Sequence, residues 1–257
     1  MLLAAVLHAV LGGSHSSDAS PGPSASAGPL LPGAPALVTQ PPPPAATVPP
    51  LGFDVSHPQC GSALPAGGGY GIVGIARGKA LTANPCLKTQ LAWANRKPGH
   101  AVYLNTGYPG TGDPVAYGRA AVDHAISVEH AVGHGTDVWW LDVETINTWA
   151  GTQQQNATVL DAMAAHLQDL GVRVGIYSTP AMWEEIAGSW APGLPIWYAT
   201  GPATYAVAVD DCANGFAGAT SAIVQWTQRD ARLHRIIDRN LICPAWRHRA
   251  AELLDVS

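Results

Sequence analysis

The sequence predicts an α/β fold, an irregular (β/α) barrel of the TIM type in which few helices separate the C-terminal strands. From Leu51 onward, short runs of β-branched and aromatic residues alternate with Ala-rich stretches, the pattern of a mainly parallel sheet with outer helices. The strand-like runs are almost continuously apolar, which is typical of strands covered on both faces. After Gly188 the helical stretches become rare, so the last strands are expected to be joined by loops instead of helices, which makes the barrel incomplete.

The expected elements follow one another along the chain. Candidate strands cover residues 52–56, 71–76, 101–106, 137–144, 172–178, 195–200, 222–227 and 235–241. Candidate helices cover residues 85–95, 116–133, 153–170 and 180–188. A further short strand is expected over residues 205–209.

The first fifty residues have a composition that does not build a core. Residues 1–13 form an apolar run that is too short for a membrane-spanning helix but suits the apolar region of an export signal, although it lacks the basic residues that usually precede one. Residues 14–50 are rich in Ser, Ala, Gly and Pro and are expected to form a disordered linker. The predicted domain organisation is therefore a signal-like segment (1–13), a linker (14–50) and one barrel (51–257).

Charge excludes some partners. Charged residues are 12% of the chain and the formal net charge is −5, so no basic stripe is available for nucleic acid or anionic lipid. We expect a secreted or cell-envelope protein that is monomeric, binds no nucleic acid and has no membrane span in its mature form. A plain hydrophobic N-terminus is the alternative to an export signal.

The four cysteines form an even set without a CxxC pair, and no histidine spacing suggests zinc. In an oxidising compartment they would form two disulfides, for which three connectivities exist. We favour Cys60 with Cys86 and Cys212 with Cys243, because each pair would link loops near neighbouring strands.

The clearest chemical motif is WWLDVE. Residues two apart on a strand share a face, so Asp142 and Glu144 are expected to point into the barrel while Leu141 and Val143 pack under the helices. Two neighbouring buried carboxyl groups are costly in a purely structural role. A hydrolase can use them, one as a proton donor to the leaving oxygen and the other to stabilise an oxocarbenium ion. The alternative is a strand that simply ends in acidic loop residues.

Two further acids lie in similar surroundings. Asp54 ends the first strand and Asp238 lies on the last one, and these strands are neighbours in a closed barrel. The sequence therefore predicts a cleft with four carboxyl groups at one mouth of the barrel.

Aromatic and amide side chains near strand ends suit sugar rings, which offer C–H faces for stacking and hydroxyls for hydrogen bonds. Strand alternation allows either Trp197 or Tyr198 to face inward, and core packing would explain several of these residues equally well. The candidate substrate-binding residues are Tyr177, Tyr198, Gln225, Trp226 and His57. No cofactor and no metal site are expected, since His130 and His134 lack the intervening glutamate of an HExxH motif.

The order of the motifs GFDVSHPQ, LDVE, GIYST, PIWYAT, VQWT and IDRN resembles glycoside hydrolase family 25, the lysozyme-like muramidases, from Leu51 to Cys243. The resemblance implies a barrel of five βα units followed by further strands. It also implies that Glu144 is the general acid, that Asp142 stabilises the transition state or orients the acetamido group, and that Asp54 and Asp238 are supporting acids. The implied reaction is hydrolysis of the β-1,4 bond between N-acetylmuramic acid and N-acetylglucosamine in peptidoglycan, with retention through neighbouring-group help.

Two stretches differ from typical members of this family. Residues 75–86 (IARGKALTANPC) replace a Lys-Ala-Thr or Ser-Glu-Gly-like stretch, and residues 102–107 (VYLNTG) replace a Tyr-His-Phe-like element. Residues 78–94 are more similar to secreted actinobacterial proteins that carry this domain without an established activity. The alternatives to a hydrolase are a non-catalytic glycan-binding or envelope module on the same barrel and a metal-dependent hydrolase that uses the acid cluster.

Overall fold

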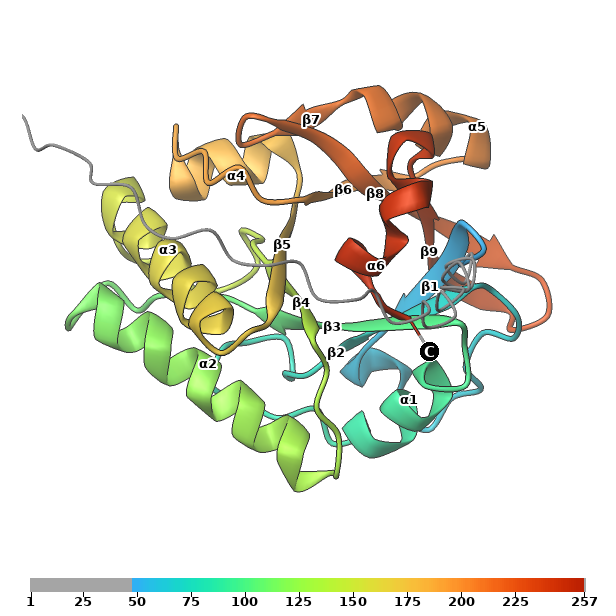
Figure 1. Cartoon of the computed structure of the whole chain (residues 1–257), viewed down its shortest axis with the longest axis horizontal. Helices are drawn as coiled ribbons and strands as arrows, with labels where there is room; N and C mark the ends of the chain where they lie inside the picture. The colour runs from blue at the N-terminus through green and yellow to red at the C-terminus, as the bar shows by residue number, and fades with distance from the viewer. Residues whose placement is uncertain (1–47, 257) are drawn as a thin grey trace, which may run out of the picture. The chain divides into compact units, whose positions relative to one another are not determined.

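The computed structural model describes residues 48–256 (Figure 1). The expected export signal (1–13) and residues 14–47 of the expected linker lie outside the described residues. Val48 is buried against the barrel, and the Pro50 carbonyl accepts a hydrogen bond of 2.8 Å from the amide of Ile242.

Within the described residues, eight strands close into a barrel. They are β1 (Leu51–Val55), β2 (Tyr70–Gly74), β3 (Gly99–Asn105), β4 (Val138–Asp142), β5 (Arg173–Ser178), β6 (Ile196–Pro202), β8 (Ala219–Asp230) and β9 (Arg235–Ile242). Their order around the barrel is β3-β2-β1-β9-β8-β6-β5-β4, and pairing of β4 with β3 closes the ring. All neighbours are parallel except β9, which is antiparallel to both β8 and β1. Two short strands are added to the ring, β7 (Gly215–Phe216) beside β8 and β10 (Asp255–Val256) beside β3.

The helices follow the first strands, as expected of βα units. They are α1 (Leu87–Ala94), α2 (Pro114–Ala131), α3 (Gln153–Asp169), α4 (Pro180–Ala187), α5 (Tyr205–Asp210) and α6 (Ala250–Leu253), with 3-10 turns η1 (His57–Gln59), η2 (Asp211–Ala213) and η3 (Pro244–Arg249). Side-chain caps explain where several begin: Asp113 accepts from the amides of Val115 and Ala116, and Thr152 accepts from the amide of Gln155. No helix in this part of the chain has the length and apolar character needed to cross a bilayer.

The predicted barrel with its helix-poor C-terminal part is confirmed, but two details of the prediction are wrong. The fourth strand ends at Asp142 instead of residue 144. Residues 205–209, expected as a strand, lie in the helix α5, because the Thr204 hydroxyl accepts from the amide of Val207 and caps a helical turn. The alternating Tyr205, Val207 and Val209 that suggested a strand are exposed.

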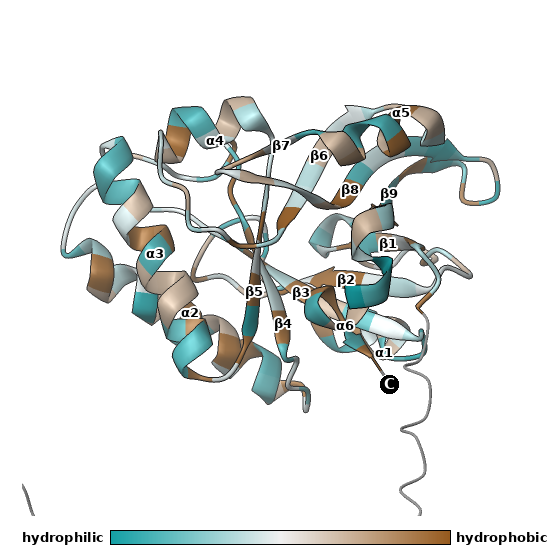
Figure 2. Ribbon diagram, turned by 45° about the horizontal axis from the view of Figure 1, so that its top comes forward, coloured by the Kyte–Doolittle hydropathy of each residue, from teal (hydrophilic) through white to brown (hydrophobic). Residues whose placement is uncertain are grey.

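The barrel interior is filled by aromatic rings that face glycines on neighbouring strands. A Cβ atom on Gly175 would lie 2.3 Å from the Trp140 ring, and one on Gly52 would lie 2.5 Å from the Tyr70 ring. Small residues therefore make room for large ones within one layer of the interior. A second core lies outside the sheet, where apolar positions of β2 to β4 pack under α1 to α3 (brown segments in Figure 2).

Two disulfides tie surface segments to this frame. They join Cys60 to Cys86 and Cys212 to Cys243, which confirms the favoured connectivity. The first connects η1 to the start of α1, and the second connects η2 to the end of β9.

Candidate active site

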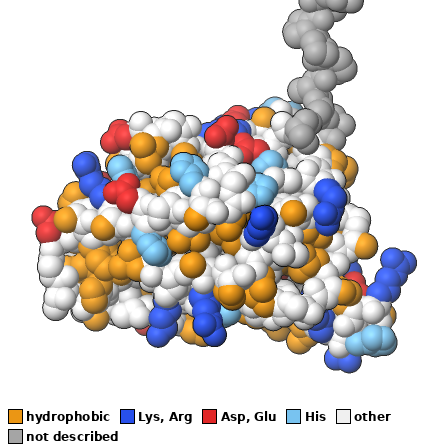
Figure 3. All heavy atoms as spheres, turned by 90° about the horizontal axis from the view of Figure 1, so that it is seen from below, with side chains coloured by type: hydrophobic (Ala, Val, Ile, Leu, Met, Phe, Trp, Pro, Cys, Tyr) orange, Lys and Arg blue, Asp and Glu red, His pale blue; other side chains and the backbone are white. Residues whose placement is uncertain are grey.

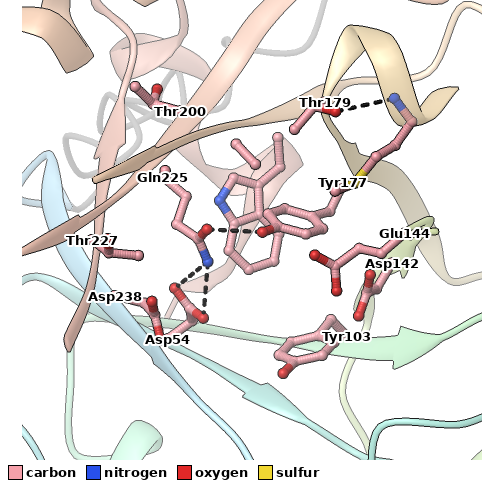
Figure 4. A pocket seen from close by; sticks show the side chains of 14 residues that line it. Asp54, Tyr103, Asp142, Glu144, Tyr177, Thr179, Thr200, Gln225, Thr227 and Asp238 are labelled. Carbon is pink, nitrogen blue, oxygen red and sulfur yellow. Dashed lines mark hydrogen bonds between the residues drawn. The ribbon is translucent and has the colours of Figure 1, made fainter. Parts of the chain in front are cut away.

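A cavity of about 380 Å³ opens at the carboxyl ends of the parallel barrel strands. All four acids singled out in the sequence, Asp54, Asp142, Glu144 and Asp238, line it. Figure 4 shows them as two pairs, with Asp54 and Asp238 on one side and Asp142 and Glu144 on the other. The volume lies within the usual range for small-molecule sites, about 300–1,000 Å³.

The first pair is set by strand register. Asp54 of β1 and Asp238 of β9 are directly opposite each other in the antiparallel ladder. Two carboxylates in that position repel each other. Burial, together with the charge of Glu144, raises the pKa of Asp238 to about 6, and burial together with the charge of Asp238 raises the pKa of Asp54 well above its ordinary value.

Asp54 is only 6% exposed, and neutral amides surround its carboxylate. The Gln225 side-chain amide donates to its two oxygens at 3.2 and 3.1 Å, and the Asn240 amide donates to Oδ2 at 2.7 Å. The Trp197 indole donates to Asn240 Oδ1 at 2.8 Å, and the Tyr177 hydroxyl donates to Gln225 Oε1 at 2.8 Å. These bonds hold Asp54 as a hydrogen-bond acceptor at the base of the cavity.

The second pair is held by the backbone beyond the end of β4. The Asp142 carbonyl accepts hydrogen bonds from the Thr106 amide (3.0 Å) and hydroxyl (2.7 Å) and from the Asn147 side chain (3.2 Å). The Glu144 carbonyl accepts from the Trp149 indole at 3.1 Å. Glu144 therefore has a fixed position although it lies two residues past the strand.

Burial also raises the pKa values of Asp142 and Glu144. Asp142 is 3% exposed and accepts a hydrogen bond from the Asn105 side chain on β3. Burial and the charge of Glu144 raise the pKa of Asp142 well above its ordinary value, and burial raises the pKa of Glu144. Because the two groups titrate as one system, the pair keeps a proton to a higher pH than an isolated carboxyl group would.

Aromatic rings form another wall of the cavity. Tyr177 and Trp197 lie with their ring centroids 4.6 Å apart, and Tyr103 meets Trp197 edge-on at 6.1 Å. Thr179 and Met182 at the start of α4, Thr200 on β6 and Thr227 on β8 complete the rim. The cavity thus combines acids, aromatic faces and hydroxyl groups, the set that suits a sugar chain.

Known proteins are similar to parts of this sequence, and others share its fold. Residues 88–210 match the family model described as "Lysozyme-like protein 1". A probable GH family 25 lysozyme 4 of Dictyostelium discoideum is 30% identical over 90 residues, which cover 34% of this chain and 40% of that protein. The solved structure of GHIP, a glycosyl hydrolase 25 of Streptococcus pneumoniae, superposes with a TM-score of 0.57 at 16% identity, over 82% of this chain and 95% of that one.

The chain has the lysozyme-like fold of glycoside hydrolase family 25. The Cpl-1 endolysin, solved with a peptidoglycan analogue, shares the fold with a TM-score of 0.51 at 16% identity, over 75% of this chain and 54% of that one. The matches span between 17% and 40% of the length of the first three curated lysozymes.

On this family 25 fold, some of the predicted sugar-binding residues line the cavity and others lie elsewhere. Tyr177 and Gln225 line it. Tyr198 does not, because alternation along β6 turns Trp197 inward and packs Tyr198 on the outer side of the sheet. In the same way Gln225 faces inward, so Trp226 is buried under α5 with Val224 and Leu241.

His57 also lies outside the lining of the cavity. The chain turns into η1 immediately after β1 and carries the His57 ring beside Gly78, in the loop after β2. Burial, with the nearby Arg77, lowers the pKa of this histidine. The prediction that His57 belongs to the cleft was therefore based on closeness in sequence alone.

Sequence reasoning missed several residues of the site, among them Tyr103, Asn105, Asn240 and Thr227. Spacing could have found two of them, because Asn240 follows Asp238 by two positions and Asn105 follows Tyr103 by two, which places each on the inward face. Within residues 48–256, no three His, Cys, Asp or Glu side chains gather as metal ligands.

Proposed function

We propose that the protein is a secreted glycoside hydrolase that cleaves the β-1,4 bond between N-acetylmuramic acid and N-acetylglucosamine in peptidoglycan. The observation that carries the proposal is the single cavity lined by Asp54, Asp142, Glu144 and Asp238 on a family 25 fold. The lysozymes among the curated relatives and the peptidoglycan analogue bound by the Cpl-1 endolysin support the substrate class. The two disulfides support an oxidising compartment outside the cytoplasm.

In the proposed reaction, the raised pKa of Glu144 lets it carry the proton that it gives to the glycosidic oxygen as the bond to the anomeric carbon breaks. The acetamido carbonyl oxygen of the same sugar forms a bond to that carbon and takes up the developing positive charge. Glu144, now a carboxylate, then removes a proton from a water molecule that attacks the same carbon and breaks its bond to the acetamido oxygen, which restores the acetamido group. The products are two shorter glycans with retained configuration, and Glu144 regains its proton.

The other acids would act through charge. Asp142 lies beside Glu144, and we infer that it stabilises the positive charge on the sugar or orients the acetamido group. Asp54 and Asp238, across the cavity, would support the same charge from the opposite side (Figure 4). The rings of Tyr177 and Trp197 offer a surface for sugar C–H faces.

The test measures release of reducing ends from purified peptidoglycan by the full chain and by its Glu144→Gln variant. We expect the variant to lose activity by a factor of about 10² to 10⁴, the usual contribution of a positioned proton donor. Glu185→Gln, which removes an exposed carboxylate of α4, is the matched control and should act like the unmodified protein. Absence of activity in the unmodified protein, with binding to the wall material retained, would instead identify a glycan-binding module.

A further inference from the structure

Strands β8 and β9 continue past the rim of the barrel as a two-stranded hairpin. The pairing of β6 with β8 ends at Thr227, and the pairing of β1 with β9 ends at Asp238. Among the described strands, residues 228–230 and 235–237 pair only with each other. We call residues 228–237 the rim hairpin; it projects beside β1 at the right of Figure 1.

One face of the rim hairpin continues the wall of the catalytic cavity. Thr227 and Asp238 are directly opposite each other in the ladder, and both line the cavity. Two positions further out, Arg229 and Ile236 are also opposite each other. Because side chains two apart share a face, Arg229 and Ile236 carry the cavity wall outward.

This face is open, whereas the opposite face is partly covered. Ile236 is 64% exposed, and Arg229 is exposed beside it. On the other face Ile237 is buried, and the Arg235 guanidinium donates to the Ala63 carbonyl at 2.6 Å in the segment after η1. An exposed isoleucine opposite an exposed arginine therefore lies next to the acids on this side of the hairpin.

The rim hairpin has a defined shape at its tip. The Asp230 carboxylate accepts hydrogen bonds from the amides of Arg232 (2.8 Å) and Leu233 (2.9 Å). Asp230 also pairs with Arg239 at 3.6 Å. These contacts fix the turn, so Arg229 and Ile236 are presented on a preformed surface.

The rim hairpin and the cavity carry opposite charge. The cavity is lined by four acids, whereas the rim hairpin holds three arginines, Arg229, Arg232 and Arg235, against one acid, Asp230, in a chain of net charge −5. Figure 3 shows basic and histidine side chains on the lobe at the right of the view, where the hairpin projects. A ligand that is neutral over the acids and anionic over the hairpin would match this distribution.

We propose that Arg229 and Ile236 bind a carboxylate-bearing peptide branch of the glycan that occupies the cavity. Arg229 would pair with the carboxylate through its guanidinium fork, and Ile236 would contact small apolar side chains of the same branch. This inference rests on the proposed function, since it assigns a specificity surface to the same substrate. It makes the hairpin selective for glycan chains that still carry their peptides.

The test measures binding by calorimetry in the full chain with Glu144→Gln, so that the ligands stay intact. The probes are a tetrasaccharide of alternating N-acetylglucosamine and N-acetylmuramic acid with free-acid peptides, the same compound with amidated peptides, and the tetrasaccharide without peptides, its lactyl carboxyl groups converted to amides. We expect the free-acid ligand to bind most tightly and Arg229→Gln to weaken its binding by about tenfold, while the other two ligands bind as before. Arg119→Gln, which removes an exposed charge on α2, is the matched control.

One further variant and one change of salt concentration complete the test. Ile236→Ala should weaken both peptide-bearing ligands and leave the bare tetrasaccharide unchanged, and high salt should reduce the preference for the free acid. Equal weakening of all three ligands by Arg229→Gln, or no preference for the free acid, would overturn the inference. Because binding is measured without turnover, a lack of hydrolysis in the unmodified protein would contradict the proposed function and leave this result unaffected.

Discussion

At the scale of single residues, one indole group determines how Asp54 is held at the base of the cavity. An indole N–H can only donate, so the oxygen of the Asn240 side chain must face Trp197 and its amide nitrogen must face Asp54. Gln225 also donates to Asp54. Asp54 therefore only accepts hydrogen bonds from these two amides, which offsets part of the rise in its pKa that burial and the charge of Asp238 cause.

The raised pKa of Asp238 leads to a prediction about pH and stability. The pKa of Asp238 rises from 3.8 to about 6 on folding, so the folded state binds more protons than the unfolded chain between these values, and stability falls as the pH rises through them. The rise corresponds to about 3 kcal/mol at most, and partial exposure reduces it to about 1–2 kcal/mol. Asp238→Asn should therefore raise the free energy of unfolding by that amount at pH 7.5, with little change at pH 4.

Urea unfolding at the two pH values measures this difference. Asp161→Asn, at an exposed position of α3, is the control and should change the free energy of unfolding by less than about 0.5 kcal/mol at either pH. A destabilised Asp238→Asn variant at pH 7.5 would show that the carboxylate makes favourable contacts that outweigh its repulsion.

At the scale of elements, the strands position the site by pairing large interior residues with glycines. The Trp140 ring occupies the space beside Gly175 on the neighbouring strand, and Trp140 precedes Asp142 by two positions on the inward face of β4. The placement of Asp142 at the cavity thus depends on the contact between Trp140 and Gly175. A residue with a side chain at position 175 would displace the ring.

We therefore expect Gly175→Ala to lower the free energy of unfolding by about 1–3 kcal/mol, the usual range for an overfilled core. Chemical denaturation measures it directly. Gly135→Ala is the matched control, because a Cβ atom there meets nothing closer than 3.7 Å, and it should change stability by less than about 1 kcal/mol. Equal effects of the two substitutions would mean that the barrel interior adjusts freely around Trp140.

At the scale of the whole molecule, the sequence predicted the barrel and the four acids of the cavity because both follow from short-range periodicity. Apolar runs and alternation identified the strands, and Asp142 and Glu144 appeared on the inward face from their spacing. The errors arose at two kinds of position. In a strand, alternation alone does not show which of the two sets of side chains faces inward, and elsewhere a helix cap determined the local structure. Trp226 was placed in the site although Gln225 takes the inward position, and Thr204 converts an apparent strand into α5. The amide network around Asp54 depends on register between β1, β8 and β9, which no local pattern contains.

The disulfides connect the stability of the whole domain to its redox environment. They close segments separated by 26 and 31 residues, and the chain-entropy model gives each a contribution of about 3 kcal/mol. The double substitution Cys212→Ser and Cys243→Ser should lower the free energy of unfolding by at least that amount, because it removes one cross-link. Cys243 is also buried against Val224 and Leu241, where a serine hydroxyl is unfavourable. Urea unfolding of this variant, with and without a reductant, gives the measurement: the reductant should destabilise the unmodified protein more than the variant, which retains one bond. If a reductant leaves the unmodified protein unchanged, the bonds do not form in solution, and the argument for an oxidising compartment fails with them.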